Sequence, residues 1–247
     1  MMRAVALNAA GAGLCLALIC PASSQADDSL ALIPARDQCK PIYAVHKDSC
    51  LLEKFYRCES DGRGTIRAEN HSEHGMFSID YTDLNGNTLL SWSKSGYANA
   101  LSILSIGSVI SYEDLKQDGT DNFDITHMVD NKWFADPIEK RFHGTITLTG
   151  ETVEIDGVLF EQGAMSANSV INAHEEMTDE GYLYFDFERG INSWASTRPE
   201  REKAGFDIYA PMKVVFPDDP DFQSNEPQYG CGTLSQVSPE PLRRAKG

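Results

Sequence analysis

Residues 145–162 read TITLTGETVEIDGVLFEQ and carry the clearest signal of fold class in the chain. Threonines alternate with Ile146 and Leu148 in the first part, as expected of a strand with one polar and one apolar face. The run 151–155 then meets 158–160 across Asp156-Gly157, a dipeptide typical of a type I′ turn because both central residues take positive φ. The stretch therefore predicts a long β-hairpin.

The rest of the chain repeats this pattern of short alternating runs separated by turn residues. A second hairpin is expected from 76–81 to 88–93 around the turn 84–87. A third is expected from 42–46 to 50–57. Further strands are expected at 65–69, 181–187, 191–196 and 212–216. We therefore expect a mainly β (α+β) protein, built as a curved antiparallel sheet or half-barrel with one or two short helices.

Two segments have helical features. Ser111 can cap a short helix over 112–116, with Asp114 at the capping-box position. The apolar residues of 98–110 fit an amphipathic helix about as well as a buried strand bent at Gly107, and we expect a helix that covers one face of the sheet. The acidic run 117–124 is interpreted as a loop between two β-rich halves.

Residues 1–26 have the organisation of a secretory signal peptide. Arg3 precedes an uncharged apolar run, 4–20, and Ser24-Gln25-Ala26 places small residues at the two positions that signal peptidase inspects. Cleavage is predicted after Ala26. A retained membrane anchor is the alternative, but glycine and asparagine interrupt the run, and about 20 strongly apolar residues are needed to span a bilayer. We expect no transmembrane segment in the mature chain.

Cleavage leaves four cysteines, Cys39, Cys50, Cys58 and Cys231. An even number in an exported protein predicts two disulfides, and the absence of a CxxC motif argues against a redox-active pair. Three pairings are possible. The hairpin that turns at 47–49 would bring Cys39 near Cys58, which leaves Cys50 to hold the C-terminal segment through Cys231.

The composition is that of an acidic globular protein. The hydrophobic fraction of 41% and the charged fraction of 23% are ordinary for a folded chain. A single β-rich domain is expected over 27–237, followed by a disordered tail, 238–247. Without Arg3 the chain has 20 basic and 37 acidic residues, a formal charge of about −17. This charge repels polyanions, so nucleic-acid binding is excluded.

The order of motifs in the second half resembles a class of exported proteins. After the short helix come DGTDNFD (118–124), VEIDGVLF (153–160) and YLYFDFERGI (182–191). Over about residues 108–216 this order is similar to uncharacterised exported β-rich proteins of Gram-negative bacteria, which look like lipoprotein-carrier or lipocalin half-barrels. The resemblance implies a curved antiparallel sheet around a helix or an apolar cavity. It also implies a location in the periplasm or outside the cell, and it carries no catalytic residue.

No motif in the sequence points clearly to catalysis or to a metal. GxSxG, Walker and GxGxxG motifs are absent, and His174 lacks the second histidine of a zincin helix and is expected on the surface. The densest set of potential metal ligands is Glu69, His71, Glu73 and His74, which we expect in a surface loop. The oxygen donors Asp80, Asp83, Asn85 and Asn87 suit calcium, but a hairpin turn explains them better.

Paired carboxylates could serve a glycosidase, and the candidates are Asp121, Asp124, Asp186 and Glu188. Because the chain has 37 acidic residues, some such pair is expected by chance. The aromatic residues expected in the core and rim of the sheet, in preference to a ligand platform, are Trp92, Trp133, Trp194, Tyr184 and Phe185. No catalytic, cofactor-binding or metal-binding residue is therefore assigned.

These observations favour a non-enzymatic protein of the bacterial cell envelope. Its expected role is to bind an apolar or lipid-like ligand, or an envelope partner, in the concave face of the half-barrel. One alternative is a secreted hydrolase with a carboxylate site in the same concavity. Another is an interaction protein that takes no small ligand.

Overall fold

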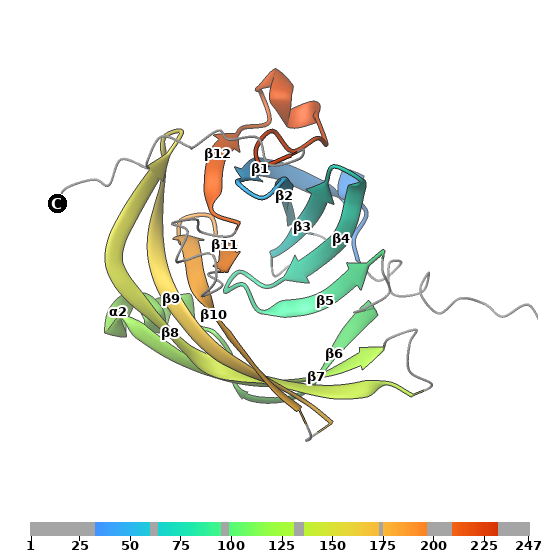
Figure 1. Ribbon diagram of the computed structural model, residues 1–247, viewed down its shortest axis with the longest axis vertical. Helices are drawn as coiled ribbons and strands as arrows, with labels where there is room; N and C mark the ends of the chain where they lie inside the picture. The colour runs from blue at the N-terminus through green and yellow to red at the C-terminus, as the bar shows by residue number, and fades with distance from the viewer. Residues whose placement is uncertain are drawn as a thin grey trace, which may run out of the picture.

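The computed structural model describes residues 33–59, 64–94, 99–130, 136–172, 175–196 and 209–231. These residues form a mainly β protein in which two six-stranded antiparallel sheets face each other (Figure 1). The expected fold class is therefore confirmed. The predicted signal peptide with its site at Ala26, together with Trp133, His174 and the tail 238–247, lies outside the described residues.

The first sheet is a meander of five strands, and a strand from near the end of the chain adds to it at one edge. Its strand order is β12-β1-β2-β3-β4-β5. The strands are β1 (Cys39–Lys47), β2 (Leu51–Cys58), β3 (Thr65–Ser72), β4 (Gly75–Thr82), β5 (Thr88–Ser93) and β12 (Pro211–Val215). The two N-terminal hairpins expected from the sequence are both present in this sheet.

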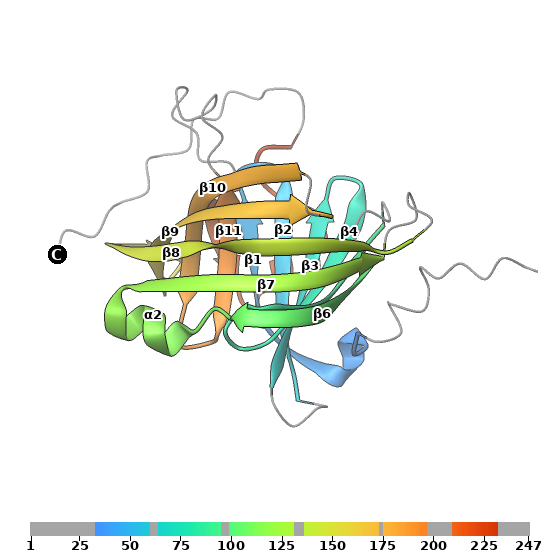
Figure 2. The same cartoon turned by 90° about the horizontal axis from the view of Figure 1, so that it is seen from below.

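The second sheet is a meander of longer strands in the order β11-β10-β9-β8-β7-β6. The strands are β6 (Asn99–Ser108), β7 (Thr120–Asp130), β8 (Ile138–Ile155), β9 (Val158–Ile171), β10 (Glu175–Asp186) and β11 (Ile191–Ser196). Figure 2 shows these strands passing across those of the first sheet at a steep angle. Strands β5 and β6 are neighbours in space but share no ladder, so the sheets remain separate.

The hairpin at residues 145–162 forms as predicted. Asp156 and Gly157 both have positive φ, 47° and 81°, which the type I′ turn requires. Ile155 pairs with Val158 directly across this turn. The tip of the hairpin then bends toward the first sheet, where the backbone amide of Val214 in β12 donates to the Asp156 carboxylate at 2.8 Å.

One predicted helix is present and the other is not. Helix α2 (Tyr112–Asp118) begins after Ser111, whose hydroxyl accepts from the Asp114 amide at 3.2 Å. The segment expected as a second helix is strand β6, with a register irregularity at Gly107. The helix prediction was wrong because pairing with β7 satisfies the backbone of a segment whose apolar pattern suited either structure. The loop expected at 117–124 is also wrong, since β7 starts at Thr120.

Apolar side chains fill both faces of the first sheet. We call the face that packs on the second sheet the inner face; Tyr43 and Phe55 lie there against Phe160 and Tyr184. The opposite, outer face is covered by residues 33–38 and by the C-terminal segment, residues 216–231, which adds Phe222. A third apolar cluster forms where α2 packs on the second sheet.

The two disulfides join the cysteines that the sequence-based hypothesis paired. Cys39 bonds to Cys58 between the neighbouring strands β1 and β2. Cys50, in the β1–β2 turn, bonds to Cys231 at the end of the C-terminal segment. The second link is reinforced by the Cys50 amide, which donates to the Tyr229 carbonyl at 2.9 Å.

A candidate ligand pocket between the sheets

A pocket of about 560 Å³ opens between the inner face of the first sheet and the edge of the second. We call it the inner pocket. Its floor comes from strands β1 to β4, and Trp194 of β11 and Tyr209 form part of its wall. The β1–β2 turn, with Cys50, and the β3–β4 turn, with His74, border it. The pocket therefore continues the space that the apolar inner core fills elsewhere.

A row of polar side chains crosses the inner face of the first sheet, and its members from β1 to β4 line the inner pocket. The row consists of Lys47, Glu53, Asn70, Asp80 and Ser91, one from each of five consecutive strands, and we call it the polar row. The register explains its continuity, because Glu53 lies opposite Asn70 and Asp80 lies opposite Ser91. Cross-strand partners present their side chains on the same face of a sheet. The row is thus built by alternation and register together.

One end of the polar row is a tight ion pair. The Lys47 ammonium lies 2.6 Å from the Glu53 carboxylate, and the Lys47 side chain is 3% exposed. Lys47 also donates to the Trp194 carbonyl at 2.8 Å, and the Ser193 hydroxyl donates to Glu53 at 2.9 Å. These contacts bind β11 of the second sheet to the first. They also use both oxygens of the Glu53 carboxylate.

The other end holds a carboxylate in a different setting. Asp80 accepts from the Ser91 hydroxyl at 2.7 Å and from the Asn70 amide at 2.9 Å. Burial raises its pKa above the usual range, and the nearby charge of Glu53 acts in the same direction. Among the described residues, no cationic side chain pairs with it. Asp80 is therefore an acceptor group on the pocket floor that only neutral donors satisfy.

Aromatic side chains line the same pocket. Trp194 is half-buried and Phe77 is 37% exposed, an unusual exposure for a large apolar side chain in this protein. Tyr209 joins them from the segment before β12, and its amide donates to the Ser49 hydroxyl at 3.2 Å. The inner pocket thus combines a polar floor with aromatic residues in its wall.

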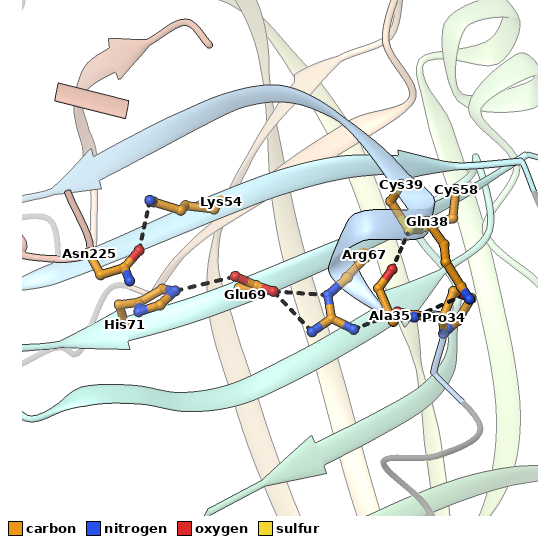
Figure 3. Close-up of polar contacts among 10 residues, drawn as sticks. All are labelled: Pro34, Ala35, Gln38, Cys39, Lys54, Cys58, Arg67, Glu69, His71 and Asn225. Atoms are coloured by element: carbon orange, nitrogen blue, oxygen red, sulfur yellow. Dashed lines mark hydrogen bonds and ion pairs between the residues drawn. A yellow bond between two sulfur atoms is a disulfide. The ribbon is translucent and has the colours of Figure 1, made fainter. Parts of the chain in front are cut away.

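A second buried polar cluster lies on the outer face of the first sheet (Figure 3). Arg67 pairs with Glu69 at 2.9 Å, and His71 lies 3.6 Å from the other Glu69 oxygen. Burial acts to raise the pKa of Glu69, but the contacts from His71 and Arg67 outweigh it and lower that pKa. Lys54 donates to the Phe222 carbonyl at 2.7 Å and to Asn225 at 2.8 Å. This cluster anchors the C-terminal segment.

The proposed metal-ligand set is divided by the fold. His71 is a buried residue of β3, 3% exposed, whereas His74 lies in the turn with 87% of its side chain exposed. The surface loop expected there was therefore wrong for Glu69 and His71, because β3 extends to Ser72 and buries both under the C-terminal segment. Within the described residues, no group of three or more potential ligands is arranged for a metal.

The calcium-like donors also separate. Asp83 accepts from the amides of Asn85 and Asn87, each at 2.9 Å, and so shapes the β4–β5 turn as the hairpin interpretation predicts. Asn87 extends this contact to the backbone of Ile110. Asp80 points instead into the inner pocket. Of these four oxygen donors, three therefore shape the β4–β5 turn, and Asp80 lines the inner pocket.

The four nominated carboxylates make local contacts, and two of them, Asp186 and Glu188, share Arg189. Asp124 pairs with Arg141 at 2.6 Å, and Asp186 pairs with Arg189 at 2.9 Å. Asp121 accepts from the Ser111 amide at 2.7 Å. Glu188 is 84% exposed and lies 3.6 Å from Arg189. None of them lines the inner pocket.

The nominated aromatic residues that are described lie in or against the core. Tyr184 and Phe185 are buried, and Trp92 packs against the outer-face cluster. Trp194 packs against the α2 cluster and also lines the inner pocket. Lys47 and Glu53 were missed by sequence reasoning. The available signal was alternation, because each stands two residues from a buried inner-face residue, Val45 or Phe55.

No helix in the described ranges is long and apolar enough to cross a membrane. Comparison of the chain with protein-family models, curated proteins and solved structures finds no match.

Proposed function

We propose that this is an exported binding protein that holds a small ligand in the inner pocket. The observation that carries the proposal is the polar row, which replaces apolar side chains on the face where the sheets pack. Burying charged and amide groups there is unfavourable unless each is paired, so their presence beside an open pocket favours a binding role. The size of the pocket suits a molecule of metabolite size.

Export is supported by two independent features. The described residues contain two disulfides, which persist in oxidising compartments. Residues 1–26 have the pattern of a signal peptide, and the motif order resembles exported envelope proteins. A periplasmic or secreted location accords with both.

The polar row changes the kind of ligand that we propose. A purely apolar or lipid-like ligand would desolvate Lys47, Glu53 and Asp80 without replacing their contacts with water. A ligand with at least one polar group and an apolar part suits both the floor and the aromatic surface. We therefore favour such a ligand over the apolar one expected from the sequence.

The proposal is tested on the exported, disulfide-bonded protein. Native mass spectrometry before and after organic extraction would reveal a copurified adduct, and a thermal-shift panel of neutral, cationic and anionic small compounds would find binders. Asn70→Ala should abolish the shift, because Asn70 orders the floor through Ser78 and Asp80. Asn122→Ala is the matched control on the exposed face of β7. No adduct and no shift with any compound would contradict the proposal.

A second candidate is the secreted hydrolase. It is favoured by two carboxylates on the floor of the inner pocket, Glu53 paired with Lys47 and Asp80 held by neutral donors, since carboxylates in unlike environments can divide acid and base roles. Turnover of a chromogenic glycoside or ester that is abolished in Asp80→Asn would support this candidate. Binding without turnover across such a panel would exclude the hydrolase and support the binding function.

A further inference from the structure

We infer that the ligand of the inner pocket carries an ammonium group, which sits on the Asp80 carboxylate in the pocket that Phe77 and Tyr209 also line. This inference rests on the proposed binding function and adds the chemical class of the ligand. It depends on which charges in the pocket are already neutralised.

The one lysine of the inner pocket is already paired. Lys47 lies 2.6 Å from Glu53, so these two charges neutralise each other. His74 lies at the rim, 3.7 Å from Glu73, and its side chain is 87% exposed. Of the other two carboxylates that line the pocket, Glu73 is 53% exposed at the rim, whereas Asp80 stands on the floor. A ligand that enters the pocket therefore meets a carboxylate with no counter-charge from the described residues.

The contacts of Asp80 leave a place for a cation. Its donors are the Asn70 amide and the Ser91 hydroxyl, both neutral. An ionised carboxylate has more acceptor sites than two donors occupy. A charge-assisted hydrogen bond from an ammonium is about twice as strong as one from a neutral donor, so it compensates burial better than a hydroxyl does.

The aromatic residues favour the same ligand charge. Trp194, Phe77 and Tyr209 line the pocket that contains Asp80. The face of an aromatic ring attracts cations, and the attraction strengthens when the cation is shielded from water. An anion would meet the same ring faces and the carboxylate unfavourably. The walls and floor therefore select for positive charge together.

The charge of the whole chain acts in the same direction. The sequence carries a formal charge of −16 at neutral pH. Such a field raises the local concentration of cations and their association rate, and it repels anionic ligands. The net charge of the protein and the Asp80 carboxylate thus both favour a cationic ligand.

Binding of an ammonium should also compete with protons. Burial raises the pKa of Asp80, so acidification protonates it more readily than an exposed aspartate. The groups that face it are Glu53 with its partner Lys47, the neutral side chains of Asn70 and Ser91, and at the rim Glu73, His74 and Tyr209. A protonated Asp80 offers no charge to an ammonium, so affinity for the cation falls as pH falls.

The test uses two probes with one skeleton, 2-phenylethylamine and 2-phenylethanol, titrated into the exported protein by calorimetry. We expect the amine to bind roughly tenfold or more tightly than the alcohol near neutral pH. Asp80→Asn should remove this preference, because the amine then has no carboxylate with which to pair. Glu151→Gln, an exposed carboxylate outside the pocket, is the matched control and should keep the preference.

A second measurement keeps the inference testable if Asp80→Asn does not fold. In the unmodified protein, the affinity for the amine should fall as the pH is lowered and Asp80 is protonated, whereas that for the alcohol should stay constant. Equal binding of the two probes, or shifts in the compound panel from neutral or anionic compounds alone, would overturn the ammonium inference and leave the binding function. No binding by any compound would overturn both.

Discussion

Removal of the disulfide between Cys50 and Cys231 should destabilise the protein more than removal of the one between Cys39 and Cys58. The two links close loops of very different length, because their cysteines are 181 and 19 residues apart. Loop-closure entropy in the unfolded chain predicts about 5 kcal/mol for the long link and about 3 kcal/mol for the short one. The expected difference is therefore about 2 kcal/mol.

The assay has to separate this entropy from lost packing, because Cys58 is fully buried and its replacement would leave a cavity. Two variants, Cys39→Ala with Cys58→Ala and Cys50→Ala with Cys231→Ala, each retain one disulfide. Urea unfolding of each variant with and without dithiothreitol then reports the remaining link with no change of side chain. Reduction should cost more in the variant that keeps Cys50 and Cys231. Equal costs, or the reverse order, would refute the loop-length argument.

Three further predictions follow from the outer face and the C-terminal segment. Burial, and then the Lys213 charge, lowers the pKa of His46 to about 4, so the unfolded chain binds a proton between about pH 6.5 and 4 that the folded protein does not. Urea unfolding should therefore show that the free energy of unfolding falls by about 1 kcal/mol for each unit by which the pH is lowered through this window. The His46→Gln variant should lose most of this pH dependence. Burial lowers the pKa of Lys54 to about 8. The free energy of unfolding should therefore rise between about pH 8 and 10, and this rise should be absent from Lys54→Met. An identical pH profile for the two proteins would contradict the burial of Lys54. Gly230 has a φ of 69°, and a Cβ added there would lie 1.7 Å from the Asp48 carbonyl oxygen. Gly230→Ala should therefore lower the yield of the Cys50–Cys231 disulfide in peptide mapping. An unchanged yield would show that the backbone around Gly230 can adjust.

Much of the architecture could be predicted because its signals are local. The type I′ turn at Asp156-Gly157, the cap at Ser111 and the Asp83 turn depend on residues within a few positions of each other. The fold class follows from many such hairpins in succession. The pairing of Cys39 with Cys58 could also be inferred, since one hairpin brings them together.

The candidate site could not be predicted in the same way. Asp80 attracted attention only as part of a run of oxygen donors, and Lys47 and Glu53 attracted none. Their significance depends on the neighbours that register supplies, such as Asn70 opposite Glu53. No spacing within a single strand encodes those neighbours. The inner pocket needs four strands of one sheet and the edge of the other before it exists.

The amino-acid sequence by itself determined the secondary structure of most segments, the acidic charge and the even set of cysteines, because alternation, turn chemistry and composition act over short distances. Tertiary structure alone decided that Asn99–Ser108 is a strand, that His71 is buried while His74 is exposed, and that a row of polar residues lies on the inner face of the first sheet. The physical reason is that backbone pairing and burial are set by partners distant in the chain. Free energy there depends on which surfaces meet, and local pattern does not specify that.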